Sequence, residues 1–361
     1  MVSAYRLRAL ATSALSGILS VFPYKLVNLF FDAAHQAAHA KGPDFLTLHR
    51  RAKSGATVPW SVLTPPVPRG TTQNCALVLQ GPLRHEDAFT LESVRYYTQT
   101  MPGCLLIVST WESEPAEALD ALRSLGAVVV VSKQPSVGGA MNVNRQAKSA
   151  LAGIVRAREL GVEWVTKSRC DQRLCNPNVM PALRDLAAAF PLEDAGSQRA
   201  RLIGTSLNTS RYCPFHFSDQ FMFGHIADME RYWSFPEDPR DGPVKLDNMT
   251  VRQMLEVTPE ALLARSYLQR SGWACETSLA AWWRVLAERF LIIDRELPDI
   301  YWPKYFPRRE RHYECYEEIL GWTQMRFSDW LRLYTARGEA FAAPEHALDL
   351  AYDTKTSTVK L

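Results

Sequence analysis

Residues 104–132, CLLIVSTWESEPAEALDALRSLGAVVVVS, hold the pattern that decides the fold. An apolar run over 104–111 is followed by a helix-forming stretch over 114–126 and by a second apolar run over 127–132. Short apolar runs bounded by turn residues predict buried strands, and the glycine at 126 predicts the end of the helix. The stretch therefore predicts a strand, a helix and a second strand, the unit from which parallel sheets are built.

The same alternation continues on both sides of this unit. Strands without polar alternation are typical of a parallel sheet covered on both faces, so we expect an α/β fold with a mostly parallel, Rossmann-type sheet flanked by helices. Ten tryptophans fall mostly in the second half of the chain, and we expect most of them in the core. The further expected strands are 74–80, 162–168, 201–207 and 221–224, and the further helices are 90–103, 142–160, 259–272 and 278–290.

Composition narrows the class of protein. The 361 residues, 47% hydrophobic and 22% charged, can bury a sizeable core. A formal net charge of +3, without a basic tract among aromatics, does not indicate a protein that binds nucleic acid. The seven cysteines show no paired or zinc-binding spacing, which favours buried thiols in a reducing compartment. We expect a cytoplasmic protein.

The amino terminus combines positive charge with apolar residues. Within residues 1–31 stand Arg6, Arg8 and Lys25, and no acid precedes Asp32. The uncharged run over 9–24 contains a glycine and a proline and is shorter than the ~20 apolar residues of a spanning helix. Apolar residues at 7, 10, 14, 18, 21 and 22 recur at helical spacing. We expect an amphipathic helix, packed on the rest of the chain or lying peripherally on the inner membrane.

A cluster of charge follows the strand that begins at residue 162. In VEWVTKSRCDQRL (162–174), an extended chain would place Lys167, Arg169, Asp171 and Arg173 on one side. Ligands of parallel sheets bind beyond the carboxyl ends of the strands. A carboxylate among cations at such an end suits a divalent metal, Mg²⁺ or Mn²⁺, that holds a nucleotide diphosphate. A solvated strand edge with a local ion pair explains the same spacing.

Two polar loops at strand ends and one helix start are further candidates for donor binding. In GGAMNVNRQ (138–146) a glycine turn opens a helix, and helix N-termini bind anions. An arginine in the first turn opposes the helix dipole, so a phosphate or ribose, or a salt bridge to Asp171 or Glu112, would explain Arg145. The candidates are Gln80, Gly81 and Pro82 at the end of the first strand, Ser109, Thr110 and Trp111 at the end of the second, and Asn142 (the expected N-cap), Asn144, Arg145 and Gln146 at the helix start.

Dinucleotide, P-loop, serine-hydrolase and zinc-protease signatures are absent from the sequence. Eight segments instead occur in a characteristic order: VLQGPL, TLESVRYYTQTMPG, IVSTWE, NVNRQAKSALAGIVRARELG, VTKSRCDQRL, FHFSDQFMFG, TPEALL and DIYWPKY. In this combination, over residues 74–306, the chain resembles the WavE-type lipopolysaccharide synthesis proteins. That family is regarded as glycosyltransferases of the GT-A type, which hold a metal and a nucleotide-sugar on an Asp-containing motif after a central strand.

The resemblance implies a GT-A-like fold, a nucleotide-sugar donor and a lipopolysaccharide or other surface glycan, a glycolipid or polysaccharide, as acceptor. Family members often show Arg-Thr-Asp where this chain has Arg169-Cys170-Asp171, which keeps the carboxylate. Asp171 would then hold the metal, and Lys167 and Arg169 would contact the nucleotide. The general GT-A motif has two acids, whereas this chain has one.

An inverting transferase needs a general base near the acceptor hydroxyl, and a carboxylate suits that work. Asp219 in CPFHFSDQFMFGH (213–225) is the first candidate, and Glu260 is the second. A turn-capping aspartate and a first-turn helix acid explain them equally well. His216 or His225 could complete a metal site, although a lone histidine is more often structural.

The densest basic patch of the chain is formed by Arg308, Arg309 and Arg311 in FPRRERHY (306–313). It is a candidate contact for a phosphorylated acceptor or for anionic lipid, and a solvated segment explains it as well.

Two other functions fit the same residues: a non-catalytic protein that binds a nucleotide-sugar or glycan at the membrane, and a sugar-phosphate or nucleotidyl transferase.

Residues 54–73 are rich in Pro, Gly, Ser and Thr and predict a linker. We expect an N-terminal helical extension with this linker over 1–70, a single GT-A-like catalytic domain over 71–335, divided into a nucleotide-binding half (71–175) and an acceptor half (176–335), and a tail over 336–361.

Overall fold

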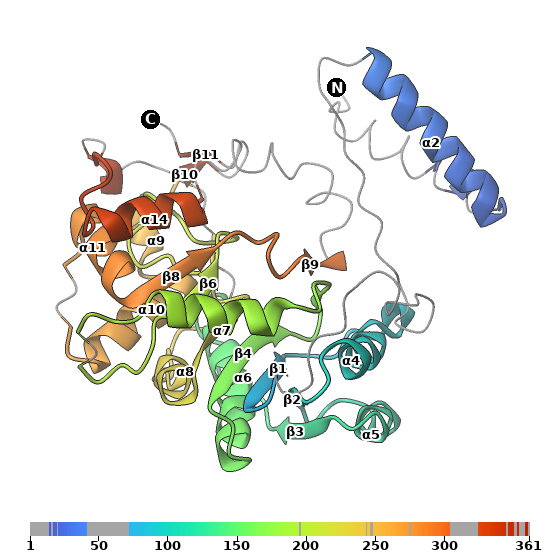
Figure 1. Cartoon of the computed structure of the whole chain (residues 1–361), viewed down its shortest axis with the longest axis horizontal. Helices are drawn as coiled ribbons and strands as arrows, with labels where there is room; N and C mark the ends of the chain where they lie inside the picture. Colours follow the sequence, from blue (N-terminus) through green and yellow to red (C-terminus); the bar gives the residue numbers. More distant parts are fainter. Residues whose placement is uncertain are drawn as a thin grey trace. The chain divides into compact units, whose positions relative to one another are not determined.

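The computed structural model divides the chain into two compact units, Met1–Arg51 and Ala52–Leu361 (Figure 1). The structure describes residues 14–15, 17–19, 21–41, 72–194, 196–242, 244–245, 248–273, 276–303, 324–343, 346–349, 352–353 and 358–359. The linker predicted over 54–73 falls outside the described residues up to position 71.

The first unit contains an 18-residue helix, α2 (Tyr24–Lys41). It starts after Pro23, whose carbonyl accepts the first helical bonds from the amides of Leu26 and Val27. Proline suits a helix start because its missing N–H would be unpaired there in any case. Helical residues also occur at 14–15 and 17–19. The sequence predicted a helix only up to residue 22, whereas in the structure a turn at 21–22 is followed by a second helical stretch over 24–41. Among the described residues, no helix is long and apolar enough to cross a membrane.

A seven-stranded sheet forms the centre of the second unit, in the order β3-β2-β1-β4-β7-β6-β8. All neighbouring pairs are parallel except those that involve β7, which runs against both β4 and β6. The expected α/β fold with a mostly parallel sheet is therefore confirmed. The strands are β1 (Cys75–Gln80), β2 (Leu105–Trp111), β3 (Val128–Ser132), β4 (Trp164–Arg169), β6 (Leu202–Thr205), β7 (Met222–His225) and β8 (Phe290–Ile293).

Helices cover both faces of the parallel half. The connections from β1 to β2 and from β2 to β3 run through α4 (Phe89–Thr100) and α5 (Ala116–Ser124), and α6 (Val143–Glu159) returns from β3 to β4. Right-handed crossovers in opposite directions place their helices on opposite faces, so α6 lies across the sheet from α4 and α5. Close packing of α6 on the sheet depends on Gly153, where a Cβ would lie 2.4 Å from Val78 Cγ1.

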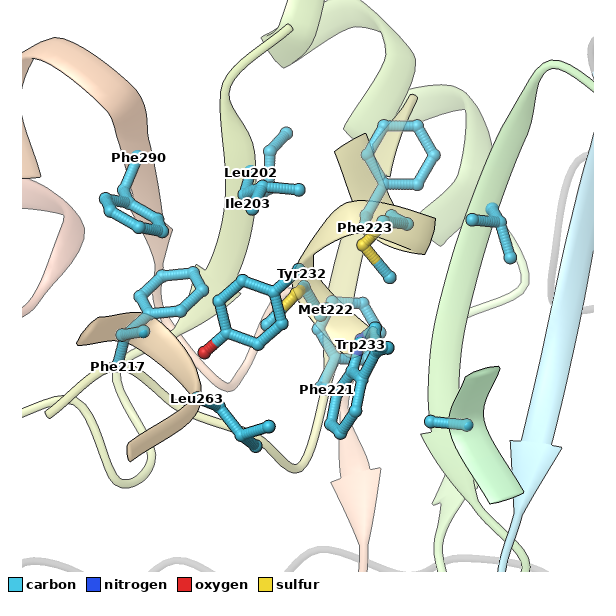
Figure 2. Packing of buried hydrophobic residues seen from close by; sticks show 14 of the residues in the cluster. Leu202, Ile203, Phe217, Phe221, Met222, Phe223, Tyr232, Trp233, Leu263 and Phe290 are labelled. Carbon is cyan, nitrogen blue, oxygen red and sulfur yellow. The ribbon is translucent and has the colours of Figure 1, made fainter. Parts of the chain in front are cut away.

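The remaining elements build the other half around an aromatic core. Figure 2 shows the rings of Phe217, Tyr232 and Phe290 gathered beside β6 and β7, with the Phe217 and Phe290 ring centroids 4.5 Å apart. Trp233, Trp282, Trp283 and Trp330 are also fully buried, as predicted for most tryptophans. The helices are α7 (Val179–Ala189), α8 (Ile226–Trp233), α9 (Val251–Met254), α10 (Pro259–Arg270), α11 (Leu279–Arg289) and α14 (Phe327–Thr335), and two small sheets pair β5 (Arg173–Leu174) with β9 (Ile300–Tyr301) and β10 (Tyr352–Asp353) with β11 (Thr358–Val359).

Candidate functional site

The carboxyl ends of the central strands meet at one edge of the sheet, as the sequence predicts. Gln80 pairs with Ser109 on one side and with Arg169 on the other. The loops that follow continue this register, since the Gly81 amide donates to the Ser109 carbonyl and the Cys170 amide donates to the Gln80 carbonyl, each at 3.0 Å. The loop with Asp171 therefore lies directly beside the end of β1, and the end of β2 lies beyond it on the other side of β1.

Asp171 is held by two side chains at this edge. Arg169 donates to it through two nitrogens, Nε to Oδ1 at 2.8 Å and Nη2 to Oδ2 at 3.1 Å. The indole Nε1 of Trp302 also donates to Oδ2, at 3.1 Å, and the Arg169 guanidinium lies 5.2 Å from the Trp302 ring centroid. The β5–β9 pairing brings residue 302 to this place. The local ion pair that explained the sequence spacing without a ligand is therefore present, between Arg169 and Asp171. It holds a partly exposed carboxylate and a partly exposed guanidinium next to each other.

Lys167 and Arg173 leave the surface of this edge. The Lys167 ammonium is fully buried, donates to the main-chain carbonyl of Asp219 and lies 4.5 Å from the Trp233 ring centroid. Burial lowers the pKa of Lys167, against the opposing charge of Asp219. Arg173 donates to the Ser93 hydroxyl on α4 at 3.0 Å. The four alternating residues do not form one exposed group: Lys167 lies within β4 and is covered, and Arg173 departs from the alternation because β4 ends at Arg169 and the chain turns there.

Asp219 and Glu260 come together below this edge, in what we call the carboxylate cluster: Lys167, His216, Asp219 and Glu260. Asp219 is 4% exposed. Its burial, and then the charge of Glu260, raise the pKa of Asp219 to about 6, while the cations Lys167 and Arg169 oppose the shift. A carboxylate whose pKa is raised toward neutral is a frequent feature of catalytic bases. The two acids predicted separately therefore belong to one buried group.

Asn208 organises the other side of the carboxylate cluster. Its side-chain amide donates to Glu260 Oε1 at 3.1 Å, and its carbonyl accepts from His216 Nδ1 at 2.9 Å. The opposite ring nitrogen, Nε2, lies 3.9 Å from Glu260 Oε2. Burial lowers the pKa of His216 to about 4, so the ring is neutral near pH 7. The sequence analysis did not single out Asn208. The structure gives it a left-handed backbone (φ 63°), which asparagine tolerates better than most residues.

His225 lies away from this cluster. It pairs with Trp164 at the start of β4, and Lys167 pairs with Met222 three residues further along that strand. Its ring nitrogen Nδ1 accepts the amide of Ala227 at 3.2 Å and caps α8. His225 therefore has a structural role at the opposite edge of the sheet.

The start of α6 divides into exposed and buried residues. Asn142 stands at the expected N-cap position, but in a left-handed conformation, and its side chain accepts from Arg145 Nη1 at 2.8 Å. Both are exposed. Asn144 is buried and exchanges two bonds with the main chain of Asp238, each 2.8 Å long. Gln146 is half-buried, and its Oε1 has no partner among the described residues. Asn144 thus fixes the loop, whereas Arg145, Asn142 and Gln146 can still bind a ligand.

The last residues of β1 and β2 turn their side chains inward. Gln80 accepts from the Ser149 hydroxyl at 2.6 Å, and the Thr110 hydroxyl donates to Glu114 at 3.3 Å. Ser109 and Trp111 are buried. Gly81 has φ +102°, a conformation that other residues rarely adopt. Donor contacts in these loops would involve the main chain and Pro82, which is exposed.

The side chains at this edge could hold a metal ion only together with oxygen atoms of a substrate. Among the described residues no three His, Cys, Asp or Glu side chains gather as a potential metal site. Mg²⁺ is commonly held by one or two carboxylates together with substrate phosphates and waters. Asp171, partly exposed at the strand edge, fits that role as a single protein ligand. The basic patch of Arg308, Arg309 and Arg311 lies outside the described residues.

Comparison with known proteins identifies a family. The family model described as WavE lipopolysaccharide synthesis matches residues 75–348, which confirms the resemblance seen in the sequence. No curated protein matches the chain. Among solved structures, a mannose-1-phosphate geranyltransferase from Thermus thermophilus aligns with 10% sequence identity and a TM-score of 0.27, over 60% of this chain and 78% of that one. A structural similarity of that degree carries no argument about the reaction.

Proposed function

Because the chain belongs to the WavE lipopolysaccharide synthesis family, we propose that it is a glycosyltransferase that moves a sugar from a nucleotide-sugar to a lipopolysaccharide or related surface-glycan acceptor. The observation that carries the proposal is the buried carboxylate cluster, in which Asp219 has a pKa raised to about 6, beside the cation Arg169 at the ligand-binding edge of the sheet.

On the donor side, Arg169 and Asp171 would hold the diphosphate. The guanidinium can bind two phosphate oxygens at once, and Arg145 with the main-chain amides at the α6 start would add positive potential. A Mg²⁺ or Mn²⁺ ion bound to Asp171 would offset the charge that develops on the nucleotide diphosphate as it leaves. Trp302 keeps the Asp171 carboxylate oriented through its indole N–H, at 3.1 Å.

On the acceptor side, Asp219 would remove the proton from the attacking hydroxyl. Above pH 6 its carboxylate is ionised and can accept that proton, and its pKa is close enough to neutral for efficient transfer. Glu260 raises the pKa of Asp219 through its charge, and Lys167 and Arg169 keep the charged form accessible. His216, neutral near pH 7, and Asn208 position Glu260.

Arg308, Arg309 and Arg311 would bind phosphate groups of the acceptor. The double variant Arg308→Glu/Arg309→Glu should raise the acceptor KM and remove its salt dependence, and donor hydrolysis should stay unchanged. An equal fall in donor hydrolysis would assign the patch to the nucleotide site or to the fold.

The proposal is tested by finding the donor and following its turnover. A thermal-shift screen of nucleotide-sugars, with and without Mn²⁺, should show one donor that raises Tm, because stabilisation grows as RT ln(1 + [L]/Kd). That donor should then release nucleotide slowly without acceptor, and faster with a lipopolysaccharide acceptor. Tight binding without any turnover would indicate a binding protein instead. Transfer of a sugar phosphate or nucleotidyl group, seen in the products by mass spectrometry, would overturn the glycosyltransferase assignment.

A further inference from the structure

The N-terminal unit exposes an unusual amount of apolar surface. In the described part of the chain, eight of the eleven exposed large hydrophobic residues lie between positions 15 and 31. Soluble monomers scatter such residues singly, and a contiguous apolar surface usually marks an interaction site. The eight residues are Leu15, Ile18, Val21, Phe22, Leu26, Leu29, Phe30 and Phe31.

Helix α2 separates its apolar and polar residues on two sides. At 100° per residue, Leu26, Leu29, Phe30, Ala33 and Ala37 fall on one side of the helix. Lys25, Asn28, Asp32 and Gln36 form a strip along the other side. With Phe31 included, the apolar side covers about 200° of the circumference. A two-helix coiled coil needs only a narrow apolar seam, so this breadth fits a surface better than a second helix.

The charges nearby identify the kind of surface. Arg6, Arg8 and Lys25 precede the first acid, Asp32, so the amino-terminal segment is positively charged. Because α2 is too polar to cross a membrane, its apolar side can enter only the interfacial layer. We propose that the unit Met1–Arg51 binds the surface of an anionic lipid bilayer, with α2 in the plane of the headgroups, its apolar side in the acyl region and its basic residues at the lipid phosphates. This inference does not depend on the reaction proposed above.

Vesicle flotation of the full-length protein tests the proposal. Vesicles of phosphatidylethanolamine with phosphatidylglycerol should carry the protein to the top of a density gradient, and neutral phosphatidylcholine vesicles should carry less. Binding to the anionic vesicles should weaken as salt is raised, since the electrostatic part is screened. The variant Leu26→Gln/Phe30→Gln should lower the partition coefficient at least about tenfold, because two large side chains no longer enter the lipid.

A matched control changes the other side of the same helix without a change of charge. Asn28→Ala/Gln36→Ala should float like the wild type, and the thermal unfolding of both double variants should match it. Equal flotation of the Leu26→Gln/Phe30→Gln variant and the wild type would overturn the proposal. So would the absence of flotation of the wild type. Sedimentation would then distinguish two other ways to cover the helix. A dimer would indicate that a second copy covers it, and a monomer would indicate that another part of the same chain covers it.

Discussion

Replacing Asp219 by Asn should slow transfer strongly and at the same time stabilise the protein at alkaline pH. A pKa raised from 3.8 to about 6 means that the charged carboxylate is about 3 kcal/mol less favourable in the folded protein than in the unfolded chain. The cost is absent below pH 3.8, where both states bind the proton, grows up to pH 6 and is complete above it. The amide side chain of the Asp219→Asn variant cannot ionise, so the variant escapes this cost.

The expected gain in unfolding free energy is up to about 3 kcal/mol at pH 8 and less than about 1 kcal/mol at pH 4. The Lys167 ammonium still has its acceptor, because that acceptor is the main-chain carbonyl of residue 219. Urea denaturation followed by tryptophan fluorescence at the two pH values measures both differences. In the same variant, kcat for transfer should fall by ~10²–10⁴, the usual contribution of a general base.

Asp228→Asn is the matched control. Asp228 is also fully buried with a raised pKa, and it accepts the amides of Arg199 and Ala200 at 2.8 and 3.0 Å. It lies on α8, which begins at the opposite edge of the sheet. Transfer should survive this change. A variant at Asp219 that is less stable than the wild type at pH 8, or one that transfers sugar at the wild-type rate, would refute the argument.

Three further predictions concern the donor site and the sheet. Asp171→Asn should abolish transfer and the Mn²⁺-dependent part of the thermal shift with donor, with the fold intact in circular dichroism; a retained metal effect would place the metal elsewhere. Arg145→Ala should weaken donor binding about tenfold to a hundredfold, because a charged hydrogen bond worth roughly 1.5–3 kcal/mol is lost. The variant should keep the wild-type Tm, because the side chain is exposed. An unchanged donor affinity in calorimetric titration would contradict this prediction. Gly153→Ala should lower the unfolding free energy by about 1–3 kcal/mol, since the new Cβ would lie 2.4 Å from Val78 Cγ1, and an unaltered denaturation midpoint would show that α6 can shift at no cost.

Local patterns predicted the elements of the sheet better than their direction. Apolar runs between helices identified the strands β1 to β4 and also β6 and β7, because burial on both faces leaves a continuous apolar sequence. The antiparallel direction of β7 depends on how distant segments pack, and the run FMFG at 221–224 carries no sign of it. Only the structure shows that β7 begins at the ligand-binding edge of the sheet. Asp219, three residues before β7, therefore lies near this edge.

The sequence grouped several candidate residues that the structure brings to one edge of the sheet, but it did not predict their contacts. Alternation grouped Arg173 with Asp171, but alternation holds only while the strand continues, and β4 ends at Arg169. Asn144 has the residue type of a ligand contact and is used instead to fix the segment at Asp238. The role of Asn208 depends on one backbone conformation, a bond to His216 eight residues away and a bond to Glu260 in a distant helix, and no short sequence pattern encodes this combination.

The bond from Trp302 to Asp171 joins residues 131 positions apart in the chain. Ribosomes add roughly 5–20 residues per second, so the loop after β4 leaves the ribosome several seconds or more before its indole partner exists. During that interval the Asp171 carboxylate can pair with its neighbour Arg169 but lacks the hydrogen bond from the indole. A nascent chain released before residue 302 would carry every strand of the central sheet and still lack a finished donor loop. The capacity to bind donor would then arise late in synthesis, after the sheet itself is complete.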